Sequence, residues 1–261
     1  MIGPEARREA ASQLATAEGE RAPIAPLTES FPGLDVVDAY EIQLANIRQR
    51  VAAGATVRGH KVGLSSKAMQ RMFDVNEPDY GHLLGEMFVF EDDAIPAADF
   101  CFPRIEMEVA FVLGEPLRGP DCSVADVLRA TAYVCPSLEL VDSRIRDWKI
   151  QLPDTIADNA SSARVILGGR ATAVTGLDLR TLGAVLRRNG EIVETGAAGA
   201  VLGNPAKAVA WLANKVHGFG VTLEAGHVVL PGACARAITV FPGDTIEAEF
   251  DVLGRVGVSF T

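Results

Sequence analysis

The sequence of 261 residues predicts an α+β fold, in which a mixed β-roll or barrel carries flanking helices. From about residue 57 onward, strand-like segments outnumber helical ones. The helical segments also fall between the strands at irregular intervals, whereas a regularly wound α/β sheet would alternate them. The start of the chain has helical periodicity instead. We therefore expect an N-terminal helical arm over residues 1–55 and a β-roll domain over residues 56–261.

Two helices are expected in the N-terminal arm. Residues 4–20 have the pattern of a polar amphipathic helix, and residues 21–33 form a connection that contains prolines. Asp35 is suited to cap a second helix, because apolar residues recur after it at helical spacing as far as Val51. This second helix is expected to end near Gly54.

The middle of the chain is predicted to contain several strands and two short helices. Runs of β-branched and aromatic residues predict strands, a Ser before a helical pattern predicts a cap, and polar clusters with Pro or Gly predict turns. Ser65 and Ser66 precede one such short helix, and Ser123 with Asp126 resembles a capping box. The expected strands or apolar stretches are 57–64, 83–90, 105–113, 133–141 and 164–167, the short helices are 67–72 and 123–132, and the turns or polar loops include 77–81, 142–148 and 154–162.

The last hundred residues predict hairpins around one helix. Asn189-Gly190 joins two strand-like segments, and both residues tolerate the positive φ of a two-residue hairpin turn. Asn204-Pro205 is typical of a helix start. The glycine-rich segment 196–203 does not match a nucleotide-binding motif, so a close-packed turn is expected there.

Composition argues against several classes of partner. The chain has 34 acidic and 24 basic residues, and its net charge of -10 repels nucleic acid and anionic membrane surfaces. No apolar run approaches the roughly 18–20 residues that cross a bilayer. The four cysteines form no C-x-x-C pair, and the N-terminus lacks the apolar core of a signal peptide. A cytoplasmic protein is therefore expected, and a small anionic substrate remains compatible with the charge.

Three glutamates are candidate metal ligands. Glu106 and Glu108 lie two apart in an apolar strand, so both carboxylates point to one face. Such spacing alone more often marks the solvated face of an edge strand. Glu139, however, interrupts a second apolar strand, and three carboxylates that face one another repel strongly and require a cation. Oxygen ligands of this kind suit Mg²⁺ or Mn²⁺ rather than zinc.

Other candidate residues have two interpretations each. Lys61 is either a lysine that keeps its ammonium in water or one held beside the carboxylates, where it balances charge and exchanges protons. Asp79 is typical of a turn, and the Asp-Asn-Ala-Ser-Ser segment 158–162 is typical of a loop or helix cap. His60 alternates with Lys61, so we expect it on the opposite strand face in a packing role.

Six short motifs identify a family when they are taken together. They are Gly59-His60-Lys61-Val62-Gly63-Leu64, Pro78-Asp79-Tyr80-Gly81, Pro103-Arg104-Ile105-Glu106-Met107-Glu108, Leu138-Glu139, Asp142-Ser143-Arg144-Ile145 and Asp158-Asn159-Ala160-Ser161-Ser162. With these motifs the chain resembles the 2-keto-4-pentenoate hydratase family of the fumarylacetoacetate hydrolase superfamily. The resemblance covers nearly the whole chain.

The resemblance implies a fold, a site and a reaction. It implies a β-roll of the fumarylacetoacetate hydrolase type and a homo-oligomer, which can associate with a related decarboxylase. The expected reaction is the hydration of 2-hydroxypenta-2,4-dienoate or a close homologue to 4-hydroxy-2-oxopentanoate, by a hydro-lyase of aromatic meta-cleavage or sterol-ring catabolism. The site residues that it implies are Glu106, Glu108 and Glu139 for Mg²⁺ or Mn²⁺, Lys61 and Asp79 for catalysis, and Ser161 for the substrate, with Ser65 and Ser66 as further candidates for the substrate carboxylate.

Three other functions are compatible with the same residues. A sister activity, 4-oxalocrotonate decarboxylation, would use the same metal cage. Hydrolysis of an acylpyruvate C–C bond would require a dedicated base that activates water, and no persuasive pair of residues is found. A non-catalytic oligomeric partner of such an enzyme is the third alternative, although it would be expected to have lost a metal ligand or Lys61.

Overall fold

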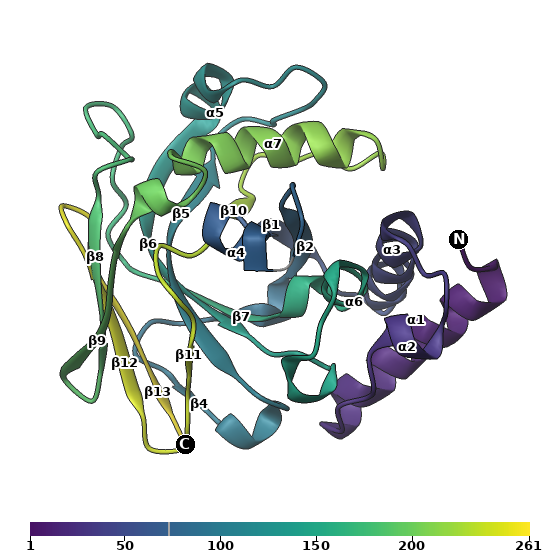
Figure 1. Cartoon of the computed structure of the whole chain (residues 1–261). Coiled ribbons are helices and arrows are strands. Elements are labelled where there is room, and N and C mark those ends of the chain that lie inside the picture. Colours follow the sequence, from purple (N-terminus) through teal and green to yellow (C-terminus); the bar gives the residue numbers. More distant parts are fainter. Residues whose placement is uncertain (73) are drawn as a thin grey trace.

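The computed structural model describes residues 1–72 and 74–261, and it has the predicted α+β fold (Figure 1). Within these residues the strands form two sheets, and the larger one curls into a half-barrel. Its strands run in the order β2-β1-β10-β5-β6-β7-β3, with β11 paired to β5. The strands of this sheet are β1 (Val57–Gly63), β2 (Asp79–Leu84), β3 (Phe88–Val89), β5 (Arg104–Leu113), β6 (Thr131–Val141), β7 (Ser162–Leu167), β10 (Val228–Leu230) and β11 (Ile238–Thr239).

The second sheet packs against the larger one and contains the predicted hairpin at Asn189-Gly190. Its order is β4-β13-β12-β8-β9, in which β13 pairs in parallel with β4 and the other pairs are antiparallel. Parallel and antiparallel pairs occur in both sheets, so the prediction of a mixed arrangement is confirmed. Its strands are β4 (Ala94–Ile95), β8 (Gly183–Arg188), β9 (Glu191–Ala197), β12 (Thr245–Phe250) and β13 (Gly254–Phe260).

Helices lie around the half-barrel rather than between its strands (Figure 1). α1 and α3 lie side by side and are joined by an ion pair between Nη2 of the half-buried Arg7 and Oδ1 of the buried Asp38, 2.6 Å apart. Asp35 caps α3 through the backbone N–H of Asp38, as predicted. The α-helices are α1 (Pro4–Glu20), α2 (Leu27–Ser30), α3 (Val36–Ala52), α4 (Lys67–Met72), α5 (Val124–Ala130), α6 (Leu152–Ala157) and α7 (Pro205–His217), and the 3₁₀ turns are η1 (Gly85–Met87), η2 (Ala97–Asp99), η3 (Arg146–Trp148), η4 (Asn159–Ser161) and η5 (Ala198–Ala200).

The two faces of β5 have different roles. The side chains of Ile105, Met107, Val109 and Phe111 belong to the main hydrophobic core. The alternate positions face the other way, where Ala110 and Val112 join a smaller apolar cluster with residues of β6, β7 and β10. Glu106 and Glu108 are on this second face. The inner surface of the half-barrel therefore carries a cluster of apolar side chains beside the two carboxylates.

Local signals misplaced Asp79 and missed two short helices, α2 and α6. Asp79, expected in a turn, is the first residue of β2 and pairs with Gly63 of β1. The connection at 21–33 contains α2, which is a single helical turn and too short to show periodicity. The polar segment at 154–162 follows and partly overlaps α6, which the Asp154 side chain caps by accepting a hydrogen bond from the backbone N–H of Gln151. No helix of the described residues is long and apolar enough to span a membrane.

Candidate active site

Three glutamates converge on the inner face of the large sheet. Each of Glu106, Glu108 and Glu139 offers one carboxylate oxygen that lies within 4.8 Å of the other two. Antiparallel pairing explains this arrangement, because Glu106 of β5 is directly opposite Glu139 of β6. β5 lies between β10 and β6 in the sheet, so the alternative of a solvated edge strand is wrong.

In the described part of the chain, two of the three carboxylates have an oxygen without a hydrogen-bond partner. Glu108 and Glu139 are fully buried, and each keeps one oxygen without a hydrogen-bond partner, Oε1 of Glu108 and Oε2 of Glu139. A buried charged oxygen without a partner is costly, and both glutamates belong to the cluster where a cation would be held. Three carboxylates without a histidine or cysteine among them are a donor set for a hard cation such as Mg²⁺. The residues present therefore fit a divalent metal.

Lys61 is the cation nearest to this cluster. Its side chain is buried, and its Nζ is 3.4 Å from Glu139 Oε1 and donates a 2.9 Å hydrogen bond to the backbone carbonyl of Ala160. Burial acts to lower the pKa of the ammonium, but Glu139, Glu106, Asp79 and Glu108 together raise it above its ordinary value. Lys61 is thus held charged inside the site, and the interpretation of a lysine with its ammonium in water is wrong.

The metal-free cluster holds protons more tightly than free glutamates do. Burial raises the pKa of Glu106 to about 7, with Lys61 acting against the shift. Burial, followed by repulsion from Glu139 and Glu106, raises the pKa of Glu108 well above its ordinary value. Burial also raises the pKa of Glu139, against the effect of Lys61. One lysine therefore does not compensate three carboxylates, and a divalent cation would supply the missing charge.

Asp79 borders the site from β2. Its Oδ2 accepts a 3.2 Å hydrogen bond from Thr155 Oγ1, while its Oδ1 is buried without a partner. Burial raises its pKa, and Lys61 acts in the opposite direction. The close approach of β2 depends on Gly63, since a Cβ at that position would lie 2.2 Å from Asp79 Oδ1. A carboxyl group with one free oxygen thus faces the same region as Lys61.

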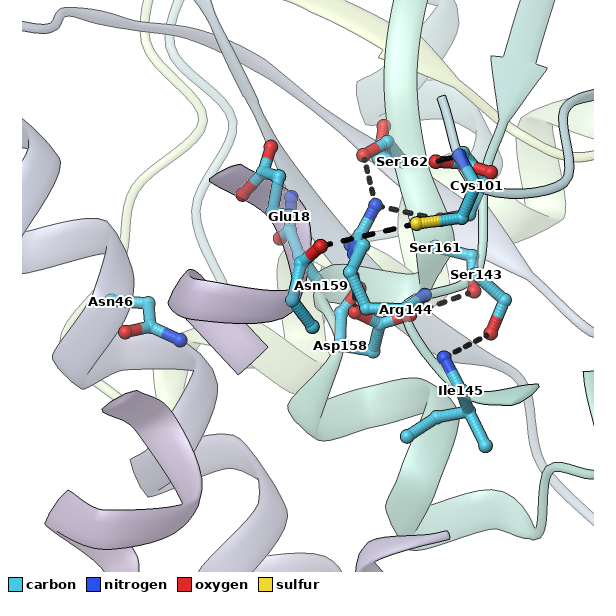
Figure 2. Close-up of polar contacts among 12 residues, drawn as sticks. Glu18, Asn46, Cys101, Ser143, Arg144, Ile145, Asp158, Asn159, Ser161 and Ser162 are labelled. Carbon is cyan, nitrogen blue, oxygen red and sulfur yellow. Dashed lines mark hydrogen bonds and ion pairs between the residues drawn. The ribbon is translucent and has the colours of Figure 1, made fainter. Parts of the chain in front are cut away.

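Ser161 and Ser162 form hydrogen bonds to different residues. The hydroxyl of Ser162 donates a 3.0 Å hydrogen bond to Glu139 Oε1. Ser161 Oγ instead donates to Asp158 Oδ2 at 3.3 Å, and Figure 2 shows these two residues. Sequence reasoning selected Ser161 and missed Ser162 as a residue of the cluster. The position of Ser162 in the sheet could have identified it, because it is the first residue of β7, which pairs with the strand that carries Glu139.

Ser65, Ser66 and Gly232 lie where the loops after β1 and β10 meet. Ser66 Oγ accepts a 3.2 Å hydrogen bond from the backbone N–H of Met69 and so acts as the predicted cap of α4. Gly232 donates its backbone N–H to Glu108 Oε2 at 2.7 Å, and a Cβ on Gly232 would lie 1.7 Å from Ser65 Oγ. Gly232 was also missed, because a backbone donor has no signature in the sequence.

His60 lies on the opposite face of β1 from Lys61, as expected. It is buried, and its ring packs against His82 and His227 at centroid distances of 4.8 and 5.7 Å. Burial lowers its pKa well below the ordinary value. The packing role predicted for His60 is confirmed.

Comparison with known proteins identifies the family of the chain. Residues 50–260 match the family described as fumarylacetoacetate (FAA) hydrolase C-terminal. The chain is 46% identical to the 2-oxo-hept-4-ene-1,7-dioate hydratase of Escherichia coli over 96% of both chains, and 42% identical to the 2-keto-4-pentenoate hydratase of Paraburkholderia xenovorans over 98% of this chain and 96% of the relative.

A solved structure extends the comparison to three dimensions. The 4-oxalocrotonate decarboxylase of Pseudomonas putida G7, complexed with magnesium and adipate, is 38% identical and superposes with a TM-score of 0.96 over 100% of this chain and 99% of its own. The family match spans most of the sequence, and these relatives cover nearly its whole length. The chain therefore belongs to the fumarylacetoacetate hydrolase family.

Proposed function

We propose that the protein is a metal-dependent hydro-lyase that adds water to 2-hydroxypenta-2,4-dienoate or a close homologue, in the catabolism of aromatic or sterol rings. The observation that carries the proposal is the buried cluster of Glu106, Glu108 and Glu139 with the Lys61 ammonium 3.4 Å from it. The hydratase names of the relatives support the hydro-lyase class.

The three glutamates would hold a divalent cation, with Mg²⁺ and Mn²⁺ as the proposed metals. When bound, the cation supplies electrostatic stabilisation of the negative charge that develops on the C2 oxygen of the substrate. Ser162 and Gly232 orient the glutamates by donating hydrogen bonds to Glu139 and Glu108. These contacts fix two ligands in place before a cation arrives, as hydrogen bonds to the ligands of a metal commonly do.

Lys61 is the proposed acid and base. In the first step the C2 hydroxyl loses its proton and C5 gains one, which converts the dienol into 2-oxopent-3-enoate. An ammonium at Lys61 can deliver the proton to C5, and the amine that results can take up the proton released at the other end of the reaction. Because Lys61 lies between Glu139 and the Ala160 carbonyl, its Nζ is held in one place while it exchanges protons.

Asp79 is proposed to position or deprotonate the water that adds to C4. The water oxygen bonds to C4 and a proton is delivered to C3, which gives 4-hydroxy-2-oxopentanoate. The free Oδ1 of Asp79 is available to accept a hydrogen bond from that water, and its raised pKa brings it nearer to the range of a general base. Ser161 and the segment Ser65-Ser66 are proposed as contacts of the substrate.

Decarboxylation of 4-oxalocrotonate is the second candidate function. It is favoured by the similarity in structure to the decarboxylase of Pseudomonas putida G7, a TM-score of 0.96 over the whole chain. Loss of CO₂ leaves an enolate on the same C2 oxygen, so the same electrostatic arrangement would serve it. We propose a cytoplasmic homo-oligomer in either case, which can associate with a related enzyme of the other activity.

One experiment separates these functions. Freshly generated 2-hydroxypenta-2,4-dienoate and 4-oxalocrotonate are supplied separately, with and without Mg²⁺ or Mn²⁺. Loss of conjugated absorbance and release of CO₂ are followed together. A hydratase consumes the dienoate in the presence of metal without releasing CO₂. Preferential CO₂ release from oxalocrotonate establishes the decarboxylase instead, and turnover of neither substrate favours the non-catalytic partner.

A further inference from the structure

The loop after α6 has an unusual backbone. Asn159, Ala160 and Ser161 have φ angles of 54°, 50° and 57°, and none of the three is a glycine. Left-handed backbone is unfavourable for an L-residue, because Cβ comes too close to the carbonyl oxygen that follows. Three such residues in succession require surrounding contacts that hold them, and backbone of this kind concentrates at functional sites.

Arg144 supplies contacts on one side of this turn. It is buried, and its Nε donates to Asp158 Oδ1 at 2.5 Å while its Nη2 donates to the backbone carbonyl of Asp158 at 2.6 Å (Figure 2). Its Nη1 donates to the carbonyl of Asp142, and the backbone N–H of Asp142 in turn binds the Ser161 carbonyl at 2.8 Å. The guanidinium therefore joins both ends of the turn to the end of β6.

The other side of the turn faces the candidate active site. The carbonyl of Ala160 accepts the 2.9 Å hydrogen bond from Lys61 Nζ, and the hydroxyl of Ser162, directly after the turn, binds Glu139. The Asn159 side chain is tied to β2, because its Oδ1 accepts from the His82 N–H and its Nδ2 donates to the His82 carbonyl. The left-handed conformation thus determines where two groups of the site are anchored.

We propose that Arg144 is a positioning residue, which holds the 159–161 turn through Asp158 and thereby fixes the Lys61 ammonium and the Glu139 carboxylate. The proposal rests on the function proposed above for Lys61 and Glu139. The donors of Arg144 are engaged with protein oxygens, so its role is to hold the chain and not to bind the substrate.

The contacts of Lys61 explain why the turn matters. Among the described residues, Lys61 Nζ has two polar partners, the Ala160 carbonyl and Glu139. If the turn relaxes, the lysine keeps its attraction to Glu139 but loses the hydrogen bond that sets its direction. Proton transfer is sensitive to such displacement, whereas binding of the substrate carboxylate is much less so. Variants of Arg144 are therefore expected to lower kcat more than they raise KM.

The test uses Arg144→Lys, Arg144→Ala and a matched control. Arg144→Lys keeps the charge beside Asp158 but not the planar fork, and Arg144→Ala removes both. Asp38→Asn is the control, because it removes the charge of another buried aspartate that pairs with an arginine, the half-buried Arg7 of the N-terminal helices. A cavity of about 370 Å³ borders Arg144, Asp158 and Ser162, so guanidinium ion can reach the space that Arg144→Ala leaves.

The expected results separate positioning from stability. Arg144→Lys should lose at least tenfold in kcat with KM within about threefold of the parent value. Arg144→Ala should lose more and recover part of kcat in millimolar guanidinium chloride, but not in the same concentration of sodium chloride. Asp38→Asn should lower Tm without changing kcat. A kcat within threefold of the parent in Arg144→Lys and Arg144→Ala, or a fall no larger than in Asp38→Asn, overturns the proposal.

A second readout does not depend on turnover. The chain has five lysines, so protein labelled with ¹³C at lysine Cε gives few NMR signals, and Lys61→Met identifies the signal of Lys61. That signal should shift and broaden in Arg144→Ala and stay unchanged in Asp38→Asn. An unchanged Lys61 signal in Arg144→Ala overturns the proposal even if the parent enzyme is active. If the Lys61 signal shifts but the parent protein turns over neither 2-hydroxypenta-2,4-dienoate nor 4-oxalocrotonate, the positioning role of Arg144 is upheld and the proposed function is refuted.

Discussion

Metal affinity is predicted to depend steeply on pH, because the metal must displace protons from the glutamate cluster. In the metal-free protein burial raises the pKa of Glu106 to about 7 and that of Glu108 well above its ordinary value. A cation requires the carboxylates in their ionised form, so binding releases the protons that they hold. Mg²⁺ should therefore bind more weakly as the pH falls below 7.

The size of the effect follows from the number of protons displaced. One proton on a group of pKa about 7 lowers the apparent affinity about tenfold between pH 8 and pH 6, since each pH unit below the pKa costs a factor of ten. A second proton on Glu108, whose pKa is raised well above its ordinary value, would make the loss of affinity over the same interval larger still. Lys61 limits the effect, because its charge opposes the rise of each carboxyl pKa.

Isothermal titration calorimetry measures this directly. Mg²⁺ is titrated into metal-free protein at several pH values between 6 and 8, in pairs of buffers that differ in ionisation enthalpy, and the difference in heat gives the number of protons released. At pH 6 we expect one to two protons. Glu106→Gln is the internal control, because it removes the group with a pKa of about 7 and should lower the slope of affinity against pH by about one. An affinity independent of pH, with no proton release, would refute the reasoning.

Three further predictions concern single residues. Lys61→Met should retain Mg²⁺ binding at pH 8 and lose roughly 10²–10⁴ in kcat, the usual contribution of a general acid or base; unchanged kcat at pH 8 would exclude that role. Glu106→Gln should keep the parent circular dichroism spectrum and lose at least tenfold in Mg²⁺ affinity, and full activity at limiting metal would remove Glu106 from the ligand set. Gly63→Ala should displace Asp79, whose Oδ1 would be 2.2 Å from the new Cβ, and should lower kcat more than tenfold. The control is Gly183→Ala, which should leave kcat unchanged because no heavy atom lies within 4 Å of its Cβ. Equal effects of the two substitutions would contradict the proposed role of Asp79.

Stability should respond to pH in the direction set by the same carboxyl groups. The folded metal-free protein binds a proton at Glu106 more tightly than the unfolded chain, whose glutamates titrate near pH 4.5. The contribution of this group therefore favours folding at low pH and is lost as the pH rises from about 4.5 through about 7. Mg²⁺ removes the penalty, so the rise in Tm on adding Mg²⁺ should be larger at pH 8 than at pH 6. The opposite order in thermal unfolding would contradict this assignment.

The sheet and its acids could be predicted because their signals are periodic. β5 is a ten-residue strand with alternating faces, and its two glutamates share a face wherever the strand lies. Lys61 and Glu139 could be selected because each interrupts an apolar strand. Their convergence could not be derived in this way, since it depends on the curl of the sheet and on the pairing of β5 with β6, which join residues distant in sequence.

The remaining features depend on contacts that have no local signature. Asp79 was assigned to a turn because Pro-Asp-Tyr-Gly has turn propensity, but pairing with β1 determines its conformation. Ser162 rather than Ser161 contacts Glu139, because three left-handed residues precede it and set which serine faces the cluster. The Gly232 amide is a backbone donor, so nothing in its residue type predicts its bond to Glu108.

The hydrophobic core imposes the geometry of the carboxylate cluster. The same strand that presents Glu106 and Glu108 on one face buries Ile105, Met107 and Phe111 on the other. A register shift of one residue would exchange these faces, so that the carboxylates would enter the main hydrophobic core and three large apolar side chains would leave it, whose burial is worth about 4.5–9 kcal/mol at roughly 1.5–3 kcal/mol each. That cost is comparable to the whole stability of an ordinary domain, about 5–15 kcal/mol. Packing on one face of β5 is therefore sufficient to hold mutually repelling carboxylates together on the other, in the arrangement that a divalent cation requires.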